Sequence, residues 1–269
     1  MIQYMNKSPL RYPGGKSRAC NILEDIILKE YDIKKYKNIV SPFFGGGSFE
    51  FHFQNMNPNI KIIANDKFIP LYNFWKEVKE DKNSLIEELK KIKNVKKEEF
   101  FNYRKEINNY NEDSKKQAII YFIINRCSFS GTTFSGGFSE EASKKRFTLS
   151  SIEKIGKLDL SSIEFHNKDF SEFIIDDYNN DEYLMFLDPP YYLENSKLYG
   201  IKGDLHKDFN HEQLFSIIKD KKNWILTYND SSYIRDLYKE FTIIEAKWTY
   251  GMNKSKKSNE IIILSLPSH

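Results

Sequence analysis

The tetrapeptide Asp188-Pro189-Pro190-Tyr191 combines residue types that could hold a polar group in a fixed position. It follows the apolar run 183–187, which predicts a buried strand. Two prolines end the hydrogen-bond ladder of the strand and fix the backbone, so the preceding carbonyls and the Asp188 side chain form a rigid array. A plain turn would need neither the aspartate before the prolines nor the aromatic ring after them. The pattern therefore predicts a chemical site at the carboxyl end of this strand.

A glycine turn, Gly45-Gly46-Gly47, follows another predicted strand. A dinucleotide-binding fingerprint that starts at Gly45 would need a third glycine where Glu50 stands, which argues against a nicotinamide site. Small residues still let the backbone approach a ligand at the carboxyl edge of the sheet. Asp66 ends the next strand, where an acidic residue can bind the two hydroxyls of a ribose; capping of the following helix is the alternative role.

The run from Pro13 to Ser17, Pro-Gly-Gly-Lys-Ser, looks like the phosphate-binding loop of an NTPase. That loop needs a glycine where Leu10 stands and an apolar strand before it. Neither is present, so the NTPase reading fails.

Seven short apolar or β-branched runs predict the strands that position these residues. They are 38–40, 61–65, 163–166, 183–187, 224–228, 241–246 and 260–266. Helical patterns lie between many of them, and this alternation predicts a mostly parallel sheet with helices on both faces. The last two runs face each other across 247–259, which predicts an antiparallel hairpin and one antiparallel edge strand.

One long stretch breaks the alternation. Residues 71–117 have a helical, lysine- and glutamate-rich pattern, and 128–139 is rich in Gly, Ser and Thr. We expect a helical insertion at 71–160 that carries an exposed loop, within a catalytic domain made of 1–70 and 161–269. No repeat or linker indicates a second independent domain.

The composition is that of an ordinary folded protein, with 269 residues, 40% hydrophobic and 29% charged. A net charge of +3 is compatible with nucleic acid but does not argue for it alone. The apolar runs fall short of a membrane span, and the N-terminus lacks the pattern of a signal peptide, which predicts a cytoplasmic protein. Cys20 and Cys127 form no CxxC pair, so neither a disulfide framework nor a zinc site is indicated.

Taken together, the motifs resemble the Dam-type (D12 class) family of DNA adenine-N6 methyltransferases. The matching stretches keep the family's order along most of the chain: 9–16 (Pro-Leu-Arg-Tyr-Pro-Gly-Gly-Lys), 42–48 (Pro-Phe-Phe-Gly-Gly-Gly-Ser), Asn65-Asp66 and Asp188-Pro189-Pro190-Tyr191. Between them, Asn125-Arg126 before Gly131 resembles the start of the family's target-recognition segment. Asn259-Glu260 resembles its closing strand. The resemblance implies a doubly wound, mostly parallel seven-stranded S-adenosylmethionine (SAM) methyltransferase sheet with a helical target-recognition insertion.

The resemblance also implies roles for individual residues. Asp188, Pro189 and Tyr191 are the expected catalytic residues. The residues expected to bind the cofactor, SAM, are Tyr12, Lys16, Phe44, Gly45, Gly47, Asp66, Asp169 and Asp188. Asp169 is expected beside the adenine of the cofactor, with a strand-end cap as its alternative role.

The implied reaction explains why an aspartate and a carbonyl are needed together. The exocyclic amine of adenine is a poor nucleophile because its lone pair is delocalised into the ring. Asp188 and the Pro189 carbonyl can each accept one N–H, and these bonds strengthen as positive charge develops on nitrogen. The base must be flipped out of the duplex to reach them, and Tyr191 is suited to stack on it.

The segment 125–147 is expected to read the target through the major groove. Its glycines and serines allow a projecting loop, its phenylalanines could fill the gap left by a flipped base, and arginine is well shaped to read guanine or clamp phosphate. The residues expected to contact DNA are Asn125, Arg126, Ser130, Thr132, Phe134 and Arg146. An active-site lid with inward phenylalanines is the alternative. The loop is also similar to that of enzymes which modify short palindromes such as CATG.

The expected partner is double-stranded DNA, with no membrane and no metal requirement. A cognate restriction endonuclease is a candidate partner, and a monomer or weak dimer is expected. Two alternatives are also methyl transfers: methylation of adenine in RNA, or of cytosine N4 in DNA. Enzymes that methylate cytosine N4 more often have a Ser-Pro-Pro-Tyr pattern, so the aspartate at position 188 favours adenine. A third alternative is a DNA-binding module that has lost catalysis, against which Asp188, Tyr191 and Lys16 argue.

Overall fold

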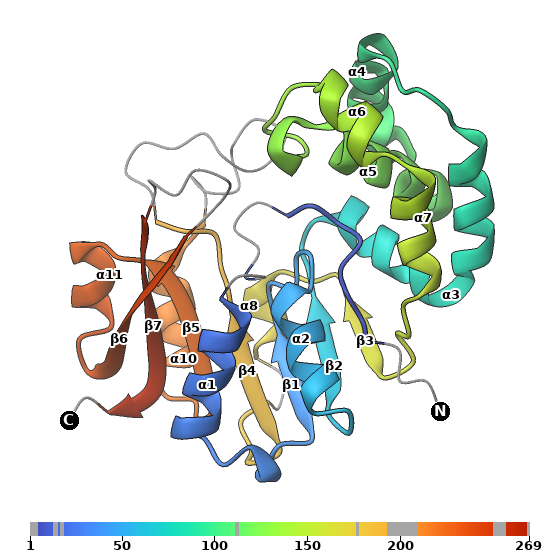
Figure 1. Cartoon of the computed structure of the whole chain (residues 1–269). Coiled ribbons are helices and arrows are strands. Elements are labelled where there is room, and N and C mark those ends of the chain that lie inside the picture. Colours follow the sequence, from blue (N-terminus) through green and yellow to red (C-terminus); the bar gives the residue numbers. More distant parts are fainter. Residues whose placement is uncertain are drawn as a thin grey trace.

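The computed structural model describes residues 5–12, 16, 19–110, 113–175, 178–192, 209–249 and 257–267. In these residues seven strands form one sheet of order β3-β2-β1-β4-β5-β7-β6 (Figure 1). Their bounds are β1 (Asn38–Ser41), β2 (Lys61–Asn65), β3 (Ile163–His166), β4 (Tyr183–Leu187), β5 (Trp224–Asn229), β6 (Phe241–Thr249) and β7 (Lys257–Pro267). The predicted α/β fold with a mostly parallel seven-stranded sheet is confirmed.

Helices cover both faces of the sheet because successive strand residues point to opposite sides. Leu184 and Phe186 pack toward α1 (Cys20–Glu30) and α2 (Ser48–Met56). Met185 and Leu187, between and after them, pack toward the helices on the other face. Those helices are α8 (Phe170–Phe173), α10 (His211–Ile218) and α11 (Ser232–Leu237).

The chain reverses its direction along the sheet between β1 and β4. It adds β2 and β3 on one side of β1, then returns to add β4 and β5 on the other side. A reversal of this kind opens a crevice at the carboxyl ends of the two central strands, which is where open α/β sheets bind ligands. The glycine turn after β1 and Asp188 after β4 both lie at this point.

The predicted hairpin of the last two strands is confirmed, but the expected antiparallel edge strand is not the edge. β7 is the strand that runs opposite to its neighbours, and it lies between β5 and β6. β6 forms the edge and runs in the same direction as β5. The reversal brings the beginning of β7, rather than its end, to the carboxyl edge of the parallel strands.

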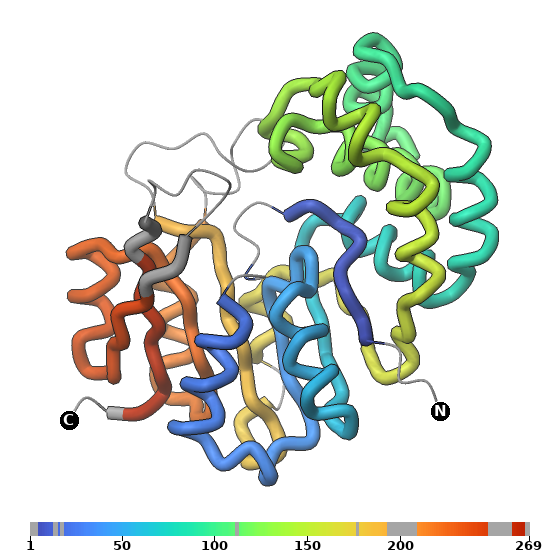
Figure 2. Tube along the Cα trace, in the orientation of Figure 1, coloured from blue at the N-terminus to red at the C-terminus, as the bar shows by residue number. Residues whose placement is uncertain are grey.

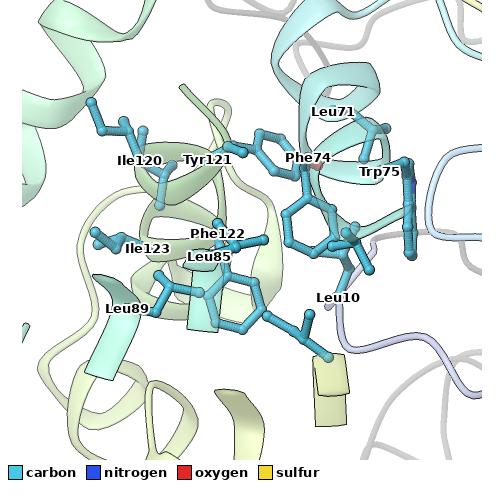
Figure 3. Packing of buried hydrophobic residues seen from close by; sticks show 14 of the residues in the cluster. Leu10, Leu71, Phe74, Trp75, Leu85, Leu89, Ile120, Tyr121, Phe122 and Ile123 are labelled. Atoms are coloured by element: carbon cyan, nitrogen blue, oxygen red, sulfur yellow. The ribbon is translucent and has the colours of Figure 1, made fainter. Parts of the chain in front are cut away.

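A group of helices lies between β2 and β3 in the chain; its first helix begins against β3, and the rest extends away from the strands (Figure 1). It consists of α3 (Ile69–Lys91), α4 (Lys97–Glu106), α5 (Ser114–Cys127), α6 (Glu140–Arg146) and α7 (Leu149–Gly156), with the short 3₁₀ helices η3 (Ile107–Tyr110) and η4 (Phe129–Gly131). α3 and α5 share a core in which the rings of Phe74 and Phe122 stack at 5.7 Å (Figure 3). That this group recognises DNA stays a prediction.

The N-terminal segment 5–12 connects the helical group to the sheet (Figure 2). On one side, Asn6 exchanges hydrogen bonds with Asn55 of α2. On the other side, the main chain of Arg11 is bound by Asn125 of α5, and Leu10 lies in the core shared by α3 and α5 (Figure 3). The segment that leads to Lys16 is therefore held from both sides.

Among the described residues, no helix combines the length and the apolar surface that crossing a membrane would require.

Candidate active site

Asp188 follows β4 and receives two hydrogen bonds on one carboxylate oxygen. The Lys16 ammonium lies 2.7 Å from Oδ1, and the Thr227 hydroxyl on β5 donates to the same atom at 2.7 Å. Thr227 is fully buried, and the Lys16 side chain is 2% exposed, whereas the Asp188 side chain is 22% exposed. The carboxylate is thus held from inside the protein and faces solvent on its other side.

The second oxygen of Asp188, Oδ2, has no hydrogen-bond partner among the described residues. A carboxylate oxygen can accept from donors along two lone pairs. Pro189, which follows, is buried, and its ring contributes no N–H to compete. The end of β4 therefore offers a fixed, charged acceptor that is open to an incoming N–H or O–H group.

Tyr191 is held at both its ring and its hydroxyl. Its O–H donates to Glu260 Oε2 at 2.6 Å, and the Lys16 ammonium lies 4.9 Å from the ring centroid. Glu260 on β7 also lies 3.8 Å from the Lys16 ammonium. From the sequence, Glu260 was expected only in a motif that resembles the closing strand of the family, and Thr227 was not predicted as a site residue. A single polar residue in an apolar strand does not reveal its cross-strand partner.

Glu50 adds a further carboxyl group beneath this network. It lies in the first turn of α2, is 3% exposed, and accepts a 2.5 Å hydrogen bond from Ser41 at the end of β1. Burial raises the pKa of Glu50 to about 7; the Ser41 hydrogen bond opposes this, the Asp188 charge adds to it and the Lys16 charge opposes it. In the sequence, Glu50 stood out only because it occupies the position where a dinucleotide-binding fingerprint needs its third glycine.

The glycine turn after β1 is shaped by positive backbone angles and by one aromatic ring. Gly45 and Gly47 have φ of +52° and +64°, values that strain other residues. A Cβ atom at Gly45 would lie 2.9 Å from the Tyr12 ring, so only glycine allows Tyr12 to cover the turn. The predicted cofactor residues Tyr12, Gly45 and Gly47 are therefore brought together.

Phe44 differs from that picture, because its side chain is 3% exposed and packs among Phe51, Trp75 and Phe165. Its main chain lies at the carboxyl edge, where the N–H donates to Asn65. Any contact of Phe44 with a ligand in this structure is left to the main chain.

Asp66 follows β2 and is bonded to the glycine turn. Its two oxygens accept N–H groups of Gly45 at 3.0 Å and Phe68 at 2.9 Å. Burial raises the pKa of the Asp66 carboxyl to about 6, although both N–H donors lower it. Each oxygen keeps a lone pair that could accept a hydroxyl. The bond to Phe68 also fits the alternative role of a cap, and the two roles are compatible.

Asp169 follows β3 and caps α8 through a 3.0 Å hydrogen bond from the Ser171 N–H. Its other oxygen pairs with Lys67 at 2.7 Å. Burial raises the pKa of Asp169, but the hydrogen bonds from Lys67 and Ser171 outweigh it and hold the pKa below its ordinary value. In this structure Asp169 therefore acts as the strand-end cap, and its contact with a cofactor stays a prediction.

The residues expected to contact DNA separate into buried and accessible ones. Asn125 is fully buried and uses its amide to bind both the N–H and the carbonyl of Arg11. Phe134 is 5% exposed and its ring lies 5.3 Å from that of Phe68. Ser130 is exposed with φ +52°, and Thr132 is half-buried and donates to the Phe129 carbonyl. The side chains of Asn125 and Phe134 thus pack in the protein interior, as the alternative of an active-site lid with inward phenylalanines expects.

Phe129 is the apolar residue that projects from the same loop. Its side chain is 64% exposed, although it belongs to the 3₁₀ helix η4. Phe134 is buried and Phe138 is half-buried, so Phe129 is the most exposed of these three phenylalanines.

Three arginines gather beside this loop. Arg126 donates to the carbonyls of Arg146 at 2.7 Å and Pro9 at 3.1 Å, and Arg11 donates to that of Ser128 at 3.1 Å. Burial, together with the neighbouring Arg11 and Arg146, lowers the pKa of Arg126 to about 10. None of the three forms an ion pair with a carboxylate in the described part of the chain. Such a cluster favours the binding of an anion. Arg11 was not among the DNA-contacting residues predicted from the sequence.

The chain matches a known family over most of its length. The sequence model of the family described as "D12 class N6 adenine-specific DNA methyltransferase" matches residues 12–252. The chain is 27% identical over 290 aligned positions to the Type II methyltransferase M.MjaIII of Methanocaldococcus jannaschii, covering 97% of this chain and 98% of that protein. It is 25% identical to the Type II methyltransferase M1.LlaDCHI of Lactococcus lactis subsp. cremoris, covering 94% of this chain and 93% of that protein.

Proposed function

The chain belongs to the D12 class of N6 adenine-specific DNA methyltransferases, and we propose that it transfers a methyl group from SAM to N6 of an adenine flipped out of a short duplex site. It is an adenine DNA methyltransferase, and DNA is its substrate. The methyl donor, the flipped base and the duplex site are the proposed parts. The observation that supports them best is the orientation of Asp188, with one oxygen fixed and the other open.

Asp188 and Pro189 act on the reacting amine. Oδ2 of Asp188 accepts one N–H and the Pro189 carbonyl accepts the other, so the nitrogen becomes pyramidal and its lone pair points away from both acceptors. As the N–C bond would form and the bond between the methyl carbon and sulfur would break, positive charge would grow on nitrogen and both hydrogen bonds would strengthen. The methylated amine would then lose one proton, to Asp188 or to solvent. Lys16 and Thr227 keep Oδ1 in place, so the carboxylate does not have to reorient during the reaction.

The residues around the glycine turn suit SAM. When bound, SAM supplies an electrophilic methyl group on a sulfonium. The turn at Gly45 and Gly47 brings the main chain close to a ligand, and Asp66 keeps acceptor capacity for the ribose hydroxyls. Tyr12 covers the turn.

Tyr191 stacks on the flipped adenine. Its ring follows the rigid strand end and is tilted against the buried Tyr228 at 6.1 Å. A base that stacks on an aromatic side chain gains about 1–3 kcal/mol in comparable sites, which offsets part of the cost of leaving the duplex.

The helical group supplies the contacts that choose the site. Phe129 enters the space left by the base, and Arg11, Arg126 and Arg146 bind the DNA backbone or a guanine. This revises the expected set, since Asn125 and Phe134 support the loop from inside rather than contact DNA. Segment 125–147 as a whole remains the proposed reader.

The alternatives are less favoured. Methylation of cytosine N4 or of RNA disagrees with a family that is adenine-specific and acts on DNA. A DNA-binding module without catalysis would not need the paired fixation of Asp188 by Lys16 and Thr227.

Transfer of tritium from methyl-labelled SAM tests the proposal directly. The substrates are duplex DNA, single-stranded DNA and RNA of equal sequence content, and the labelled nucleoside is identified after digestion. We expect N6-methyladenine in the duplex. Label in cytosine, label in RNA, or no transfer by a protein that binds SAM would each overturn the proposal.

Both relatives are named as Type II methyltransferases, which supports a restriction endonuclease as the functional partner of this chain. CATG is the proposed site. Sequencing of genomic DNA from an expressing strain, with detection of modified bases, reads the site directly. We also propose a monomer or weak dimer, which static light scattering at two protein concentrations would test.

A further inference from the structure

Glu260 is a buried carboxylate on β7. It directly precedes the apolar run Ile261 to Leu264, and its side chain is 2% exposed. Burial of a carboxylate is costly unless it is paired and hydrogen-bonded. It accepts a hydrogen bond from the Tyr191 hydroxyl at 2.6 Å and lies 3.8 Å from the Lys16 ammonium, and both groups belong to the site at the end of β4. Glu260 is therefore tied to that site.

The reversed direction of β7 explains how Glu260 reaches that site. Glu260 pairs with Asn229, the last residue of β5. A parallel strand in the position of β7 would bring its end, not its beginning, to the carboxyl edge. The antiparallel strand instead places Glu260, near its beginning, at the carboxyl edge where the Tyr191 hydroxyl lies.

The hydrogen bond from Tyr191 fixes the end of the ring that is farthest from the backbone. The backbone after two prolines restrains the near end, and Glu260 restrains the hydroxyl. Between them, Lys16 lies 4.9 Å from the ring centroid and 2.7 Å from Asp188. The stacking ring and the catalytic carboxylate are thus joined through one ammonium group and one glutamate.

We propose that Glu260 is a positioning residue, which holds Tyr191 in the orientation that stacks on the flipped adenine and shares Lys16 with Asp188. This rests on the proposed function, since it assumes that Tyr191 receives the base. Loss of Glu260 removes the hydrogen bond that restrains the Tyr191 hydroxyl and one of the carboxylates near Lys16, so it slows the step after DNA binding and leaves the affinity for SAM unchanged.

The test compares Glu260→Ala, Glu260→Gln, Tyr191→Phe and the double variant Tyr191→Phe/Glu260→Ala in full-length protein. Methylation kinetics use duplex DNA and SAM, and a second duplex carries 2-aminopurine at the target position to report stacking by fluorescence. Glu245→Ala is the matched control, because Glu245 lies on the adjacent strand β6 and is exposed.

We expect Glu260→Ala to lower kcat roughly tenfold or more, as the loss of a hydrogen bond to a charged group allows, with KM for SAM unchanged. Glu260→Gln keeps an acceptor for Tyr191 and recovers part of that loss. Tyr191→Phe and Glu260→Ala shift the 2-aminopurine signal in the same direction, and the double variant shifts it little further than Glu260→Ala alone. Glu245→Ala matches the wild type.

Additive effects of the two substitutions on kcat and on fluorescence would overturn the proposal, and so would wild-type kinetics of Glu260→Ala. If Glu260→Ala does not fold, Glu260→Gln decides: it removes charge but keeps the bond, so a change in fluorescence equal to that of Tyr191→Phe contradicts the role. Failure of the proposed function is seen separately, because wild-type protein would then form no N6-methyladenine. In that case the coupling of Tyr191 and Glu260 is still measured in the free energy of unfolding.

Discussion

Lys16 and Asp188 are 172 positions apart in the chain, and the Lys16 ammonium lies 2.7 Å from the Asp188 Oδ1 atom. The pair joins the N-terminal segment to the end of the central strand β4. Lys16 was expected to bind the cofactor, and the structure gives it a direct contact with the proposed catalytic carboxylate. The same atom of Asp188 also receives the Thr227 hydroxyl, so a change at any of the three residues acts on the orientation of the other oxygen.

Asp188→Ala is expected to lower kcat by roughly 10²–10³-fold or more, the cost of removing one preorganised group that stabilises a transition state. The fold should persist, because Asp188 is partly exposed and Lys16 keeps Glu260 nearby. Tritium transfer to duplex DNA measures the loss, and a thermal melt with binding of S-adenosylhomocysteine serves as the control. Turnover close to that of the wild type would contradict the mechanism.

Thr227→Val replaces the hydroxyl by a methyl group of similar size, so Oδ1 of Asp188 keeps Lys16 and loses its second donor. We expect a fall in kcat of about tenfold from the loss of a hydrogen bond to a charged acceptor, with KM for SAM unchanged. Thr227→Ser restores the donor and should restore most of the activity. Equal activity of the valine and serine variants would show that this hydroxyl does not position Asp188.

Asp66→Ala is expected to weaken binding of S-adenosylhomocysteine much more than binding of DNA, since the proposed partner of Asp66 is a ribose. The ionised carboxylate is the better acceptor, and burial raises the pKa of Asp66 to about 6. The affinity of the wild type should therefore be full above pH 7 and fall as the pH drops through about 6. Calorimetry at pH 5.5 and pH 7.5 measures both effects, and an affinity of Asp66→Ala equal to that of the wild type would rule out the assignment.

Glu50→Gln is expected to stabilise the protein more at pH 8 than at pH 5. Burial raises the pKa of Glu50 from 4.5 to about 7, so the folded state holds the proton more tightly than the unfolded state. The wild type therefore loses stability as the pH rises from about 4.5 to about 7, by on the order of 3 kcal/mol, and glutamine removes this dependence. Urea unfolding at the two pH values measures the difference. Asp66 contributes in the same direction in both proteins and cancels in the comparison.

Phe129→Ala and Phe134→Ala should separate recognition from packing. Phe134 is buried against Phe68, so its truncation should cost about 3–5 kcal/mol of stability. Phe129 is 64% exposed, and its truncation should change stability by less than about 0.5 kcal/mol while it weakens base flipping. Thermal melts and 2-aminopurine fluorescence in a bound duplex distinguish the two, and an unchanged fluorescence in Phe129→Ala would exclude it as the residue that fills the gap.

The strands and the carboxyl-edge motifs could be predicted because the information for them is local. The apolar run 183–187 predicts a buried strand through its length and residue types, and the two prolines after it end the strand wherever it lies. The same holds for the glycine turn after β1 and for Asp66 after β2. Since the carboxyl ends of parallel strands share one edge, the convergence of these motifs follows once the sheet is known to be parallel.

The partners of those motifs depend on the tertiary structure. Thr227 and Glu260 contact Asp188 and Tyr191 because of the order and direction of β4, β5 and β7, and the reversed strand lies inside the sheet rather than at its edge. Asn125, expected to contact DNA, is buried because the segment that carries Arg11 passes over α5. Strand order, register and the path of a distant segment are set by the packing of the whole chain. The local sequence around a polar residue therefore does not identify the side chain that it contacts in the folded protein.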